Sequence, residues 1–105
     1  MRLTHTTKLK NLKSIRQYGL LKSFSRQGRV AVWLHTAKLD KWGEAHVKVR
    51  HGWENCDIVH IVVDVPRSWV RKHANGLYYC DRDIPPARFR SIRSVVSVET
   101  VLPLE

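Results

Sequence analysis

The stretch Met1-Arg2-Leu3-Thr4-His5-Thr6-Thr7 decides how the chain begins to fold, because a short strand pattern leads directly into a histidine and two hydroxyl residues. The residues that follow predict an amphipathic helix, with Thr7 as its N-cap and Gly19 as its stop. The apolar face of that helix would carry Leu9, Leu12 and Ile15. A polar triplet at a strand-to-helix junction is a place where a ligand can sit.

Length and composition predict one small globular domain over residues 1–105. The chain is 43% hydrophobic and has four tryptophans, enough for a single core. No apolar run approaches the roughly 20 residues that span a bilayer. The basic N-terminus has neither the apolar segment nor the cleavage site of an export signal. We therefore expect a cytoplasmic protein with no membrane partner.

The charge of the chain is strongly positive and unevenly distributed. Nineteen Lys and Arg residues against nine Asp and Glu give a net charge of +10, and no acidic residue precedes Asp40. A basic N-terminal third favours an anionic partner, either DNA or RNA or a phosphate-bearing cofactor. A solvated face that only aids solubility is the alternative.

Two further elements are predicted in the first half of the chain. Val30 to Leu34 is typical of a strand, and Thr36 is placed to cap a second helix. The residues of that helix at core-facing spacing are Leu39, Trp42, Ala45, His46 and Val49. Ile58 to Val65 follows as the clearest strand, and its β-branched run indicates a central strand covered on both faces.

The second half of the sequence predicts a short helix and at least two further strands. Pro66 is placed at the first position of a helix that runs through His73 and ends at Asn75-Gly76. Leu77 to Cys80 predicts a strand, and Phe89 to Ile92 and Val95 to Val101 predict the last strand or strands. Cys56 and Cys80 lack metal-site spacing, so we expect two half-buried reduced thiols. The order of elements fits a compact α+β domain.

Three short motifs, taken in order, resemble the ADP-ribosyltransferase-like family over residues 2–101. Its first motif is a strand ending in His-x-Thr or His-x-Ser, which His5, Thr6 and Thr7 match. The resemblance implies a single-domain α+β fold with a split β-sheet, two to three short helices and an NAD cleft between two strands. It also implies that His5 holds a ribose hydroxyl, that backbone groups of Thr6 hold the nicotinamide amide, and that Thr7 adds a polar anchor. The alternative is a surface histidine beside a threonine that only caps the helix.

The second motif of the family is an aromatic-containing strand, which Val32-Trp33-Leu34-His35-Thr36 resembles. The resemblance implies that Trp33 or His46 stacks on the flat nicotinamide ring and that His35 faces the cleft. Packing in the core or on the strand face is the alternative for Trp33. A solvent-facing position is the alternative for His35.

The third motif of the family pairs a glutamate with a later Ile-Pro-Pro-like turn, which Asp83-Ile84-Pro85-Pro86 resembles. The glutamate position then falls near Leu77, which cannot stabilise a cationic transition state. Asp81 or Asp83 would have to substitute from a shifted register, and Asp83 is the candidate carboxylate. Pairing with Arg82 or Arg88, or capping of the turn, is the alternative for each. RNA 2'-phosphotransferases of the same fold use NAD without this glutamate and rely on histidine and arginines. Arg26 and Arg29 suit NAD or nucleic-acid phosphates in the same way.

The resemblance therefore implies an NAD-dependent transferase that moves ADP-ribose to a nucleic acid or another anionic target, with His5 and Asp83 as catalytic residues. A metal-independent ribonuclease that uses His5, His35 and His46 is one alternative. A basic nucleic-acid-binding domain without activity is another, although Trp42 and Trp69 are expected on core faces rather than in a stacking surface. The histidine spacing matches no metal motif, so no metal is expected.

Overall fold

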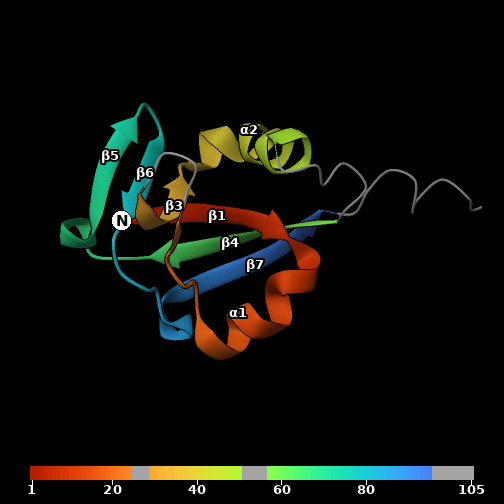
Figure 1. The fold of residues 1–105 in the computed structure, drawn as a ribbon, viewed down its shortest axis with the longest axis horizontal. Helices are drawn as coiled ribbons and strands as arrows, with labels where there is room; N and C mark the ends of the chain where they lie inside the picture. The colour runs from red at the N-terminus through yellow and green to blue at the C-terminus, as the bar shows by residue number, and fades with distance from the viewer. Residues whose placement is uncertain (25–28, 51–56, 96–105) are drawn as a thin grey trace, which may run out of the picture.

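A computed structural model describes residues 1–24, 29–50 and 57–95 (Figure 1). These residues form an α+β fold around one antiparallel sheet with the strand order β5-β6-β3-β1-β4-β7, and β2 pairs with β3 beside that path. The strands are β1 (Arg2–Lys8), β2 (Ser23–Phe24), β3 (Val30–His35), β4 (Ile58–Asp64), β5 (Val70–Ala74), β6 (Leu77–Cys80) and β7 (Phe89–Val95). The helices are α1 (Leu12–Tyr18) and α2 (Asp40–Ala45). No helix of the described residues is long and apolar enough to cross a membrane.

The two sides of the sheet differ in chemistry. Figure 1 shows α1 below the sheet and α2 above it. Side chains alternate between the two sides along each strand, and the α1 side carries the apolar core around Leu3, Leu34 and Ile61. The α2 side instead carries buried polar groups, among them His35 and His60. Polar groups buried in this way need hydrogen-bond partners.

Strand β4 is the central strand that its sequence predicts. It pairs with β1 along its whole length and with β7 on its other edge. Ile58, Val59 and Ile61 are fully buried, which confirms that both faces are covered. The strands predicted at Val30 to Leu34 and at Leu77 to Cys80 are also confirmed. The strand predicted at Phe89 to Ile92 lies within β7, and the prediction for residues 96–101 falls outside the described residues.

The prediction that Thr7 caps the first helix is wrong. β1 continues to Lys8, because every residue from Arg2 to Lys8 has a partner on β4. Thr7 is therefore a strand residue, and its Oγ1 accepts a hydrogen bond of 3.1 Å from Asn11 Nδ2. A 3-10 turn (Leu9–Asn11) then leads into α1, which begins at Leu12. Gly19 ends the helix as predicted, with a positive φ of 87° that favours glycine.

The prediction of a helix after Pro66 is also wrong beyond the first turn. A 3-10 turn (Arg67–Trp69) is followed by β5, which pairs with β6 as the edge of the sheet. Asn75-Gly76 closes this hairpin rather than ending a helix, and Gly76 has a φ of 75°. Backbone pairing with β6 outweighs the local helix signal of the proline.

The second helix exists, but it turns a different face to the sheet than its apolar spacing predicts. A 3-10 turn (Ala37–Leu39) precedes α2, and a π-helical turn (His46–Arg50) follows it. The buried positions are Gly43 and Val47, whereas Trp42 is 44% exposed and Val49 is 71% exposed. A Cβ on residue 43 would lie 2.8 Å from His35 Nε2. Glycine therefore lets the helix approach the polar side of the sheet closely.

Candidate functional site

His5 is fixed against the neighbouring strand as a neutral ring. Its Nδ1 lies 2.8 Å from the backbone oxygen of Trp33, and because a carbonyl only accepts, Nδ1 carries the hydrogen. The pKa of His5 lies below its ordinary value, mainly because the ring is buried. The hydrogen bond to Trp33 acts to raise this pKa, and nearby His35 acts to lower it. The ring is therefore neutral near pH 7, and its Nε2 is a hydrogen-bond acceptor.

Thr6 joins two buried histidines from the strands on either side of it. Its Oγ1 lies 2.7 Å from His35 Nε2 on β3 and 2.8 Å from His60 Nδ1 on β4. Thr6 and His60 are direct partners in the β1–β4 register, so the sheet itself sets this contact. The side chain of His60 is fully buried.

Helix α2 and Thr36, which precedes the 3-10 turn before α2, supply the ends of this polar network. His60 Nε2 lies 2.7 Å from Glu44 Oε2, and His35 Nδ1 lies 2.9 Å from the backbone oxygen of Thr36. His35 Nδ1 is also 3.6 Å from Asp40 Oδ1. Asp40 in turn accepts a hydrogen bond of 2.7 Å from Arg93 on β7. The network therefore ties α2 to the polar side of the sheet.

The hydrogens of this network can be assigned by counting. Burial lowers the pKa of His35, so its neutral ring donates from Nδ1 to Thr36 and accepts from Thr6 at Nε2. The Thr6 hydroxyl has then used its one hydrogen, so His60 Nδ1 must donate to it. The remaining contact joins His60 Nε2 to Glu44 Oε2, and one hydrogen held between these two atoms completes it.

Three of the residues around this network could also offer ligand atoms to a metal ion. Among the described residues, His35, Asp40 and His60 offer ligand atoms within 4.8 Å of one another. However, Thr6 Oγ1 lies between the two rings and hydrogen-bonds to both. A metal ion would have to displace these hydrogen bonds, because ring nitrogens bind zinc at about 2.0–2.1 Å. The arrangement as it stands suits a proton rather than a metal.

The structure brings two other predicted binding residues together through Tyr79. The ring of Trp33 lies 5.5 Å from that of Tyr79, and the Arg29 guanidinium lies 4.2 Å from the same ring. His46 instead stacks on exposed Trp42, with ring centroids 4.9 Å apart. Arg26 lies outside the described residues.

Asp83 has a structural partner of its own. Its Oδ1 accepts a hydrogen bond of 2.8 Å from the backbone N–H of Lys22. Next to it, Leu20 and Ile84 exchange backbone hydrogen bonds. Asp83 therefore joins the segment after α1 to the segment after β6. Leu77, near the position where the resemblance places a glutamate, pairs with His35 across β6 and β3.

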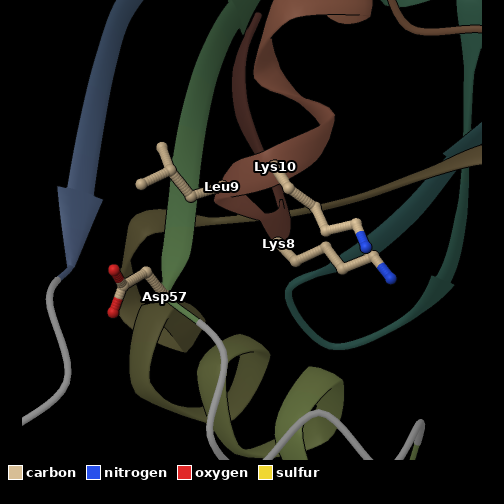
Figure 2. A pocket seen from close by; sticks show the side chains of 4 residues that line it. All are labelled: Lys8, Leu9, Lys10 and Asp57. Carbon is tan, nitrogen blue, oxygen red and sulfur yellow. The ribbon is translucent and has the colours of Figure 1, made fainter.

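A hollow of about 300 Å³ lies elsewhere, at the end of β1 (Figure 2). Lys8, Leu9, Lys10 and Asp57 line it, and Figure 2 shows the two lysine side chains extending away from Asp57. None of the predicted ligand residues lines this hollow. It is therefore separate from the site around His5 and Thr6.

Sequence reasoning missed His60 and Glu44. His60 had a usable signal, because it interrupts the apolar run Ile58-Val59-His60-Ile61-Val62-Val63 of a strand that had to be buried. A buried imidazole needs a partner. Glu44 had no such signal, because its role depends on which face of α2 meets the sheet. No protein-family model matches this sequence, and no curated protein is significantly similar to it.

Proposed function

We propose that this protein binds NAD where β1 and β3 diverge, and that it transfers ADP-ribose to a nucleic acid or another anionic target. One observation carries the proposal. β1 pairs with β3 through the single partner pair Thr4↔His35, whereas it pairs with β4 at every residue from Arg2 to Lys8. The predicted ligand residues His5 and Trp33 flank this short junction and contact each other. Outside that pair, side chains rather than a regular ladder join the two strands, through His5 to the Trp33 carbonyl and through Thr6 to His35.

The chemistry of His5 supports the ribose-binding role. Its Nδ1–H is used on the Trp33 carbonyl, which fixes the ring and leaves Nε2 as an acceptor. Burial keeps the pKa of His5 low and the ring uncharged. A ribose hydroxyl can donate to such a nitrogen. Holding the tautomer through a backbone carbonyl keeps that acceptor ready without a proton shift.

Thr6 and His35 have a different role in this proposal from the one their motifs imply. The Thr6 hydroxyl and the His35 ring bind each other beneath α2. We therefore assign these side chains to positioning β1 and β3, while the backbone of Thr6 remains the proposed partner of the nicotinamide amide. Asp83 remains the proposed catalytic carboxylate, acting through Oδ2 because Oδ1 binds the Lys22 amide.

The ribonuclease alternative gains no support from the histidines. His5, His35 and His46 each have different neighbours: the Trp33 carbonyl, the Thr6 hydroxyl and the Trp42 ring. General acid–base cleavage needs its two groups at one scissile phosphate. The transferase therefore remains the better supported function.

The activity is tested by following nicotinamide release from NAD in the presence of single-stranded RNA, single-stranded DNA or an acidic protein. We expect release with at least one acceptor, and its loss in Asp83→Asn. Release that Asp83→Asn leaves unchanged would remove Asp83 from the mechanism. Absence of release with every acceptor, together with absence of NAD binding, would overturn the proposed function.

A further inference from the structure

The α2 side of the sheet has a second region, outside the polar network. α2 packs against β1, whereas β6 and β5 form the far edge of the sheet (Figure 1). The register places Trp33, Tyr79 and Arg71 in a row across β3, β6 and β5. His73 adds an edge-on contact with Trp33, with ring centroids 5.0 Å apart. We call Arg29, Trp33, Arg71, His73 and Tyr79 the aromatic platform.

The aromatic platform is accessible and positively charged. Arg29, Arg71 and His73 are exposed, and Trp33 and Tyr79 are half-buried. Strands β3, β5 and β6 contain no Asp or Glu. The flat rings therefore lie among cations, and no carboxylate from these strands competes with an anionic ligand for those cations. The net charge of +10 adds long-range attraction for a polyanion.

The contacts within the platform show which ligand chemistry it accepts. The Arg29 guanidinium already lies over the face of Tyr79, 4.2 Å from the ring centroid. A nucleobase that stacks on this face of the tyrosine must displace the guanidinium, which can then bind a phosphate of the same strand. Arg71 donates to the carbonyls of Ser68 and Val70, at 3.2 Å each. Its guanidinium has five N–H donors, so these bonds orient it and still allow a phosphate contact.

We propose that single-stranded nucleic acid docks on the aromatic platform, with bases stacked on Tyr79 and His73 and phosphates bound by Arg29 and Arg71. An acidic protein would use the cations but would gain little from the rings, whereas a single strand uses both. His5 contacts only the backbone oxygen of Trp33, and its side chain lies on the α1 side with that of Ile61, so the platform and the His5 side chain are on opposite sides of the sheet. The role of that strand as the acceptor of ADP-ribose rests on the proposed function, but the docking does not.

The docking is tested by fluorescence anisotropy with labelled oligonucleotides of about 12 nucleotides, as single strands and as duplexes, without NAD. The platform variants are His73→Ala, Tyr79→Leu and Arg71→Gln. Each lost base contact should weaken binding about tenfold, because stacking contributes about 1–3 kcal/mol per base. Arg71→Gln should also reduce the slope of log K against log salt by about 0.7, the value for one phosphate of a single strand.

Two exposed residues outside the platform serve as matched controls. Arg16→Gln removes one charge from α1, on the other side of the sheet, and Trp42→Ala removes an exposed ring from α2. Both should bind single strands within about twofold of the wild-type protein. Melting curves of all variants confirm that the fold is intact.

Several results would overturn the docking proposal. One is wild-type affinity for single strands in His73→Ala and Tyr79→Leu. Another is a loss of affinity in Arg16→Gln as large as in the platform variants, and a third is equal affinity for duplexes and single strands. Each would show that delocalised charge alone binds the strand. Binding of an acidic peptide but of no oligonucleotide would show a protein partner instead. The NAD proposal can be tested independently of the docking proposal. His5→Ala should lose NAD binding and keep oligonucleotide binding, whereas His73→Ala should keep NAD binding and lose affinity for the oligonucleotide.

Discussion

Glu44 Oε2 lies 2.7 Å from Nε2 of His60, a side chain that is fully buried in the central strand of the sheet. With His60 Nδ1 donating to Thr6, one hydrogen held between His60 Nε2 and Glu44 Oε2 completes this contact. A glutamine at position 44 can supply that hydrogen from its own amide.

Glu44→Gln is therefore expected to change the free energy of unfolding by less than about 1 kcal/mol, whereas Glu44→Ala should cost about 1–3 kcal/mol by leaving a buried ring nitrogen unpaired. Urea unfolding measures both variants. The ¹⁵N shifts of His60 should show a protonated Nδ1 in the wild-type protein and in Glu44→Gln. A His60 ring with an unprotonated Nδ1 would contradict the assignment of hydrogens.

Among substitutions in β1 that keep the size and shape of the side chain, Thr6→Val should be one of the more destabilising. Valine keeps the volume and β-branching of threonine but removes the hydroxyl that His35 and His60 share. Leaving two buried ring nitrogens unpaired is expected to cost about 2–4 kcal/mol in unfolding free energy. Thr6→Ser retains the hydroxyl and is the matched control. Equal stability of the valine and serine variants would show that the network contributes nothing.

The low pKa of His5 predicts a loss of stability in acid. The unfolded ring titrates at about 6.5, and burial holds the native pKa below that value. The unfolded state therefore takes up a proton that the native ring does not, so stability is full above about pH 6.5 and falls as the pH drops towards the native pKa. The lowered pKa of His35 acts in the same direction.

His5→Asn tests this contribution, because the Asn amide can still donate to the Trp33 carbonyl but does not titrate. Unfolding free energies at about pH 7.5 and about pH 5.5 should differ less in His5→Asn than in the wild-type protein. An unchanged difference would assign the acid sensitivity to other groups.

The apolar pattern predicted much of the fold, because burial on both faces leaves a direct mark on the sequence. Ile58 to Val65 is the clearest case, and its strand is central. The errors at Thr7 and after Pro66 share one cause: local helix signals were outweighed by strand pairing with β4 and β6, which are distant in sequence. The orientation of α2 was set by Gly43, where a side chain would meet His35 and Thr6.

The sequence motifs assigned residues only within single strands, such as His5 in β1 and Trp33 in β3. The contact between these two residues, through a backbone carbonyl, depends on how the strands lie side by side. The link from Thr6 through His60 to Glu44 crosses two strands and a helix, so only the register of the sheet brings these groups together. His46 was placed by its spacing, and the actual face of α2 puts it against Trp42 instead.

The most direct test of the central claim is an NMR titration of ¹⁵N-labelled protein with NAD. The account predicts saturable shifts centred on His5, Thr6 and Trp33, with the His5 Nε2 resonance moving as it accepts a hydrogen bond and with no saturable shifts in His5→Ala. No shift at about millimolar NAD, where a weak complex with a free energy of about −4 kcal/mol would be half formed, would contradict it. Saturable shifts confined to Lys8, Lys10 and Asp57 would contradict it equally, because they would place the ligand in the separate hollow at the end of β1.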